Sequence, residues 1–166
     1  MNIKKAIQQQ TVYKTEKKPN KSSGFLLYEG ASRLDKTQNI VAIITMKTTN
    51  KKIGNMLQLW VLHKDVKPTE ASKKGLDVAT CGGCKLRQNL GGACYVTLHH
   101  APTAIYKAYK KGNYKKLEFN EYKKHFEGKV IRFGAYGEPS AIPLEILIHL
   151  KTWAKNNTSY THQWKQ

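Results

Sequence analysis

The residues best able to do chemistry in this chain are three cysteines that lie close together. Cys81 and Cys84 form a C-x2-C pair, and nine residues separate Cys84 from Cys94. The C-x2-C spacing lets two thiolates of one tight turn face a single ion. An odd, clustered set of cysteines does not suit a disulfide framework, which spreads an even number along a secreted chain. The pattern therefore predicts a metal site.

Two histidines just beyond Cys94, His99 and His100, are candidates for the fourth ligand. Zinc prefers four sulfur or nitrogen ligands in a tetrahedron. Neighbouring residues of an extended chain point to opposite faces, so only one of the two histidines can serve. The sequence thus predicts a structural Cys3His zinc site. The remaining possibility without a metal is that the cysteines are free thiols and Cys94 is a core residue.

An iron–sulfur cluster is the alternative cofactor. A four-iron cluster held by three thiolates leaves one iron open, which is how radical enzymes bind S-adenosylmethionine. The gaps between the cysteines here are two and nine residues. That superfamily has gaps of three and two, and the difference favours zinc.

A second group of candidate residues, Tyr136, Glu138 and His162, lies near the end of the chain. Tyr136 and Glu138 follow a predicted strand, at the edge where open α/β sheets bind ligands. Glu138 is a candidate general base or metal-bound carboxylate, or a favourable charge at a helix N-terminus. The next predicted strand ends near His162, beside that turn. The three are candidate catalytic residues, although His162 also suits a surface position at a frayed terminus.

Short apolar runs predict the elements that position these residues. Runs at 24–30, 39–46 and 56–63 are rich in β-branched and aromatic residues and predict an antiparallel meander. An irregular, glycine-rich segment then carries the cysteines. Pro102 suits the first turn of a helix that ends at Gly112.

The last part of the chain predicts a second short helix around 118–126 and then a β-α-β unit. The unit consists of a strand at 129–134, a helix at 143–156 and a closing strand at 159–164. A crossover of that length joins parallel strands. The fold class is mixed α/β, with a flexible basic arm at 1–22 and a single domain at 23–166.

Charge indicates the partner. Lys and Arg number 29 against 11 Asp and Glu, which gives a formal net charge of +18 at pH 7. Self-repulsion of that size favours an anionic partner, although a lysine-rich composition that serves only solubility is the plainer alternative. Arginine occurs only at Arg33, Arg87 and Arg132. Lysine suits attraction to phosphates more than bidentate reading of base edges. We therefore expect nucleic acid, either DNA or RNA, bound mainly through its phosphates.

The expected phosphate contacts are lysines at a predicted hairpin tip and along the helical region: Lys47, Lys51, Lys52, Lys107, Lys110, Lys111, Lys115, Lys116, Lys123 and Lys124. Tyrosines interleave with them, at Tyr106, Tyr109, Tyr114 and Tyr122. Lysines beside stacking aromatics are typical of single-strand binders. We nevertheless expect these tyrosines to pack in the core.

Apolar patterning excludes a membrane role. The sequence has no apolar run near 18 residues, and its basic N-terminus lacks the apolar region of a secretory signal. We expect a cytoplasmic protein with no membrane partner.

Three strings of the chain, CGGCKLRQNLGGACYV, GAYGEP and YTHQW, resemble those of a family of phage-encoded and prokaryotic proteins without an assigned function. The resemblance runs from about Gly24 to Trp164. It implies a mobile-element setting, in the cytoplasm of a host cell, and no particular reaction. Members of that family continue past the His-Gln-Trp element into sequence with more cysteines, where this chain stops. If those elements complete an active site, this short form lacks it.

The sequence thus predicts a phage-type basic nucleic-acid-binding protein with a structural zinc site. A metal-dependent nuclease or replication-initiation enzyme is one alternative, although adjacent His99 and His100 lack the one-residue gap of the nickase motif. An iron–sulfur radical-type enzyme and an inhibitor of a host nucleoprotein are the others. Whether the protein is an enzyme, and how it oligomerises, stays open.

Overall fold

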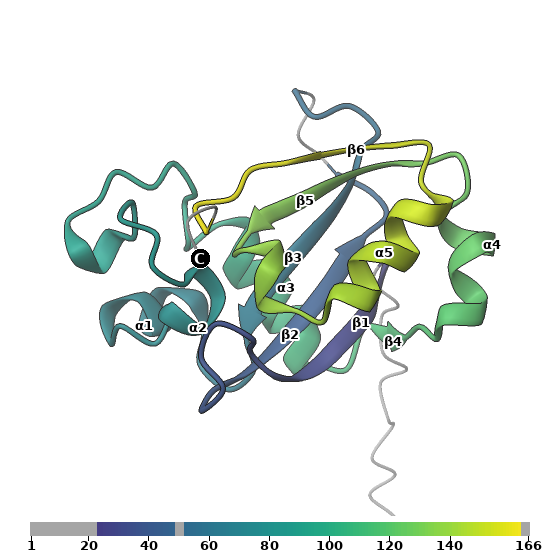
Figure 1. Cartoon of the computed structure of the whole chain (residues 1–166). Helices are drawn as coiled ribbons and strands as arrows, with labels where there is room; N and C mark the ends of the chain where they lie inside the picture. The colour runs from purple at the N-terminus through teal and green to yellow at the C-terminus, as the bar shows by residue number, and fades with distance from the viewer. Residues whose placement is uncertain (1–22, 49–51, 164–166) are drawn as a thin grey trace, which may run out of the picture.

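The structure is a computed structural model that describes residues 23–48 and 52–163 (Figure 1). Its centre is a six-stranded sheet with the order β4-β1-β2-β3-β5-β6. The strands are β1 (Gly24–Ala31), β2 (Asn39–Thr45), β3 (Leu57–His63), β4 (Lys115–Lys116), β5 (Val130–Tyr136) and β6 (Asn156–Ser159). The α-helices are α1 (Pro68–Lys73), α2 (Val78–Cys81), α3 (Ala101–Lys110), α4 (Tyr122–Phe126) and α5 (Leu144–Trp153). This confirms the predicted mixed α/β class. The predicted arm at 1–22 lies outside the described residues.

The first three strands form the antiparallel meander that the apolar runs predict. Side chains of β2 alternate between the two faces of the sheet, as the two-residue period of a strand requires. Ile40 and Ile44 therefore join one hydrophobic cluster, and Val41 and Ile43 join the other. Every residue of β3 is buried, because the strand lies inside the sheet and is covered on both faces.

Helices cover both faces of the sheet (Figure 1). On one face, Phe126 of α4 and Leu150 of α5 are fully buried against the strands. On the other, Ile105 and Tyr106 of α3 pack against Trp60 of β3. The predicted helix that begins near Pro102 is confirmed as α3, and the short helix predicted around 118–126 is confirmed by α4 and the 3-10 turn before it.

The carboxyl-terminal half adds parallel strands to the meander. β5 runs parallel to β3 and to β6, and α5 connects β5 to β6, which confirms the predicted β-α-β unit. The closing strand predicted at 159–164 is wrong, because β6 covers Asn156–Ser159 and pairs only with the first part of β5. Beyond Ser159, the backbone N–H of His162 donates to the carboxylate of Glu138 at 2.7 Å instead of to a strand. The chain beyond Ser159 is thus bonded to a side chain and does not continue the pairing with β5.

The segment between β3 and the cysteines is helical where the sequence predicts irregular chain. α1 begins at Pro68, whose fixed φ suits a first turn. α2 ends at Cys81, where Gly82 adopts a φ of +56°. Both helices are too short for helical periodicity to show in the sequence. No helix among the described residues is long and apolar enough to cross a membrane.

Candidate functional site

The three cysteines line one cavity. Cys81 and Cys84 lie at the end of α2 and in the turn after it, and Cys94 lies in a later loop. Cys81, Cys84 and Cys94 share a cavity of about 80 Å³ with Tyr136, Glu138 and His162. We call this space the thiol cavity. It lies where β5 ends, at Tyr136, and where the chain continues after β6. The three cysteines and the three candidate catalytic residues, which the sequence singles out separately, therefore line one cavity.

Arg87 fixes the turn that carries the first two cysteines. Its guanidinium donates to Asp77 Oδ1 from Nε at 3.0 Å and from Nη2 at 2.7 Å. It also donates to the carbonyl oxygens of Gly82 and Gly75, each at 3.1 Å. The side chains of Arg87 and Asp77 are only 10% and 4% exposed. This arginine, which the sequence left without a role, is thus a buried clamp around the Cys81 turn.

Burial sets the electrostatics of the thiol cavity. Burial raises the pKa of Cys81 to about 12, which outweighs the opposing effect of the Thr80 hydroxyl. Burial also raises the pKa of Tyr136 well above its ordinary value, and the nearby cysteines add to that rise. Without a cation the Cys81 thiol is therefore neutral at physiological pH. A divalent metal would supply the positive charge that stabilises thiolates.

Glu138 and His162 are in contact, as the predicted parallel unit implies. Glu138 is 4% exposed. Its Oε2 accepts a hydrogen bond from the Thr161 hydroxyl at 2.8 Å, and its Oε1 accepts one from the His162 backbone N–H at 2.7 Å. The same Oε1 lies 3.4 Å from His162 Nδ1. Both carboxylate oxygens therefore hold the segment that follows β6.

Gln163 ties that segment back to the cysteine turn. Its amide Nε2 donates to the carbonyl of Cys81 at 3.1 Å, and its Oε1 accepts from the N–H of Gly83 at 3.4 Å. A side chain at Gly82 would place its Cβ 2.8 Å from the Gln163 amide. Sequence reasoning missed this role of Gln163, because only the fold brings it to the cysteines.

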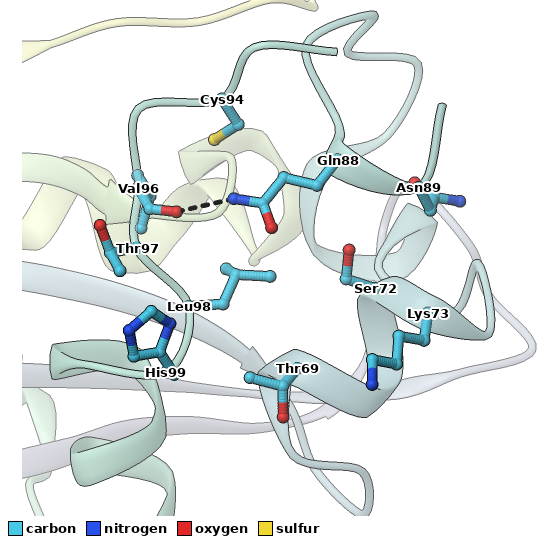
Figure 2. Close-up of a pocket in the computed structure, with 10 residues that line it drawn as sticks. All are labelled: Thr69, Ser72, Lys73, Gln88, Asn89, Cys94, Val96, Thr97, Leu98 and His99. Carbon is cyan, nitrogen blue, oxygen red and sulfur yellow. Dashed lines mark hydrogen bonds between the residues drawn. The ribbon is translucent and has the colours of Figure 1, made fainter. Parts of the chain in front are cut away.

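The structure places His99 and His100 at other cavities. His99 lines a cavity beside α1 that Cys94 also lines, and Figure 2 shows the two residues at opposite ends of one chain segment. His100 lines the surface groove described next, and the two rings lie 4.3 Å apart between centroids. Within residues 23–48 and 52–163, no three Cys, His, Asp or Glu side chains already stand in a metal-binding arrangement. The predicted zinc site stays a prediction.

A second feature is a surface groove of about 420 Å³ next to the thiol cavity. We call it the basic groove and define it by Lys47, Trp60, Tyr95, His100 and Arg132, which line it. The Nη2 atom of Arg132 donates to the Tyr95 hydroxyl at 2.9 Å, and Tyr95 is 69% exposed. No carboxylate occurs among the described residues that line the groove.

The basic groove and the thiol cavity share a wall, formed by Tyr95 and Val96. Of the groove residues, the sequence singles out Lys47 for phosphate contact and His100 for metal binding. Tyr95 and Arg132 were missed, because residues so distant in the chain give no local signal of their meeting.

The other predicted phosphate contacts divide into two sets. Lysines exposed to solvent that form no ion pair with a described residue are Lys107, Lys110, Lys111 and Lys124. Lysines that pair with a carboxylate of Glu121, Glu118 or Glu127 are Lys115, Lys116 and Lys123. Lys52 is exposed, and Lys51 lies outside the described residues. The first set is thus the better placed for an external anion.

Two of the four tyrosines of the helical region are core residues, and the other two are half-buried. Tyr106 and Tyr122 are 8% and 0% exposed, which confirms the expectation that they pack in the core. Tyr109 is half-buried and donates its hydroxyl proton to Glu29 Oε2 at 2.8 Å. Tyr106 of α3 and Tyr122 of α4 are therefore not available for base stacking.

No family model, curated protein or solved structure matches this chain. The functional argument therefore rests on the geometry of the two features.

Proposed function

We propose that this is a nucleic-acid-binding protein of the host-cell cytoplasm, of the phage type that the motifs resemble, and that it binds single strands in the basic groove. The observation that carries this proposal is the composition of the groove. Lys47 and Arg132 provide positive charge, Tyr95 provides an exposed aromatic face, and no carboxylate lines the groove among the described residues. This is the combination that single-strand binders use.

In the proposed complex, different groove residues contact the phosphates and the bases of the nucleic acid. Lys47 and Arg132 are the contacts for phosphates, since each carries a full charge on a long side chain. The hydrogen bond from Arg132 holds the Tyr95 ring in place, so a base stacks on a ring that is already oriented. Stacking contributes about 1–3 kcal/mol per base in such sites. The lysines of α3 extend the positive surface beyond the groove.

The proposal is tested by titrating labelled single-stranded DNA, single-stranded RNA and duplex DNA over a range of salt concentrations. If about six phosphates are neutralised, the log–log salt slope for single strands is about −4. We expect tighter binding to single strands than to duplex, because only unpaired bases reach Tyr95. An affinity independent of salt contradicts the proposal.

Two matched double variants locate the site. K47Q/R132Q removes two charges from the groove, and K151Q/K155Q removes two exposed charges on and just after α5 that form no ion pair with a described residue. We expect the groove variant to lose about 10–100-fold in affinity and the control less than about threefold. Y95A should lose about tenfold because stacking needs the ring, and Y95F should lose less than Y95A, because it keeps the ring and removes only the hydroxyl that accepts from Arg132. Equal losses in both double variants would show that only net charge matters.

A second candidate function is an iron–sulfur enzyme. It is favoured by the fact that three cysteines, and neither His99 nor His100, line the thiol cavity where a parallel strand ends. Three thiolates are the number that leaves one iron of a four-iron cluster open. Iron and a brown absorption band in protein purified without oxygen would make this the leading function. Strand cleavage in the titrations with added magnesium or manganese would instead favour a nuclease.

A further inference from the structure

We propose that the thiol cavity is a zinc site whose fourth ligand is His162, with Cys81, Cys84 and Cys94 as the other three and Glu138 as the residue that positions the imidazole. This inference is independent of the nucleic-acid proposal. It replaces His99 and His100 as ligands with a histidine that is far away in the sequence and lines the same cavity as the thiols.

The ligand set has the right chemistry. Three thiolates and one neutral imidazole form a Cys3His site, one of the usual sets for structural zinc. Each thiol that binds gives its proton to solvent, because the metal binds thiolate rather than thiol. The resulting centre carries a net charge of −1, from Zn²⁺ and three thiolates. In a chain with a formal charge of +18, that charge meets no general repulsion.

Glu138 orients His162 in the manner of a carboxylate behind a zinc-bound histidine. Its Oε1 faces Nδ1 of the ring at 3.4 Å and also accepts the backbone N–H of the same residue. With Nδ1 next to this carboxylate, Nε2 is the nitrogen that would bind the metal in the proposed site. Such second partners fix the tautomer and the direction of the ring, and their loss weakens metal affinity about 10–100-fold.

Two side chains, Gln163 and Arg87, fix the cysteine turn beside the cavity. Gln163 bridges to the backbone of the cysteine turn, and Arg87 clamps that turn from behind. The backbones of Cys81 and His162 are therefore held by partly buried hydrogen bonds. In the described residues, these four side chains do not stand in a coordinating arrangement. Metal binding therefore requires Cys84 and Cys94 to move, and these two residues flank an exposed loop that contains Gly91 at a φ of +74°.

The test is reconstitution of the full chain with Co²⁺ and with Zn²⁺ after removal of metal under reducing conditions. Co²⁺ in a tetrahedral thiolate site gives intense visible d–d bands and a sulfur-to-cobalt charge-transfer band. We expect about one Zn²⁺ per chain and both bands in the wild type. The H99A/H100A double variant should match the wild type in stoichiometry and spectrum.

The decisive variants are at His162 and Glu138. H162A should bind Zn²⁺ at least 100-fold more weakly and change the cobalt spectrum, whereas H162C should restore tight binding with a more sulfur-rich spectrum. E138Q should keep the stoichiometry and bind about 10–100-fold more weakly. The His162 side chain is 45% exposed, so H162A should fold, and circular dichroism checks this. The inference is overturned if H162A binds like wild type, if H99A/H100A loses the metal, or if the wild type binds neither ion.

Discussion

The thiol cavity and the basic groove share a wall, yet they are built in opposite ways. The cavity is framed by buried charges that find partners within the chain, such as Arg87 with Asp77 and Glu138 with the segment after β6. The groove presents cations without a carboxylate beside them and an exposed Tyr95. We infer that buried polar groups with partners mark the segments whose position the fold fixes. Uncompensated surface charge marks where it meets something else.

The largest effect we expect comes from breaking the buried clamp. R87M removes the guanidinium and leaves Asp77 buried without its partner, which should lower the free energy of unfolding by about 3–5 kcal/mol. Thermal or urea unfolding measures this. The exposed pair of Lys67 and Glu70 is the control, and K67M should cost less than about 1 kcal/mol.

The same unfolding measurement on a variant of the basic groove provides the comparison with R87M. K47Q/R132Q should leave unfolding within about 0.5 kcal/mol of wild type, since surface substitutions away from buried networks rarely do more. If this variant and R87M destabilised the chain equally, the division into a structural frame and an open binding surface would be wrong.

A smaller effect is expected at the contact between the cysteine turn and Gln163. Gly82 has a φ of +56° and a Cβ there would lie 2.8 Å from the Gln163 amide. G82A should lower the unfolding free energy by about 2–3 kcal/mol, from backbone strain together with displacement of Gln163. Gly112 is the matched control, with a φ of +70° and nothing within 4 Å of its Cβ position. G112A should cost only about 1 kcal/mol of strain. Equal costs would mean that Gln163 moves freely and does not lock the turn.

The smallest effect concerns pH and a buried histidine outside both features. Burial lowers the pKa of His63 below 6.5, and Asp65 and Asp35 oppose this only in part. Its Nδ1 accepts from the backbone N–H groups of Asp65 and Val66, so the folded state needs the neutral ring. The unfolded chain therefore binds the proton more readily, and stability that is complete above pH 6.5 is lost as the pH falls.

Unfolding measured between pH 8 and pH 5 checks this prediction. The loss of stability should be modest in the wild type, because one group contributes about 1.4 kcal/mol for each unit by which its pKa differs between the folded and unfolded states. H63N, which keeps an acceptor near the Nδ1 position, should flatten this part of the profile. An unchanged slope in H63N would assign the pH dependence to other groups.

The sequence predicted those parts of the molecule that depend on local pattern. The meander followed from short apolar runs rich in β-branched and aromatic residues, and α3 followed from Pro102 and Gly112. The proximity of Glu138 and His162 was also predictable, because a β-α-β unit brings the ends of its two strands together. The predicted bounds of the closing strand were wrong. Its pairing with β5 ends at Ser159, and the backbone N–H of His162 donates to the Glu138 carboxylate instead.

The parts that could not be predicted depend on contacts between distant segments. His99 and His100 are close to Cys94 in the chain, and sequence proximity made them the natural ligand candidates. Nothing local indicates that His162 lines the cavity of the cysteines, or that Arg132 meets Tyr95. Chain spacing constrains a metal site only within one turn, as it does for Cys81 and Cys84, and the remaining ligands depend on the tertiary fold.

The claim that the thiol cavity is a metal centre, separate from the binding surface, is tested most directly by metal content and an absorption spectrum of protein purified without oxygen. We expect about one zinc per chain and a colourless sample in both the wild type and K47Q/R132Q. Iron with a brown charge-transfer band would contradict it and make the cavity a cluster site. Loss of metal in K47Q/R132Q would contradict the separation of the two features.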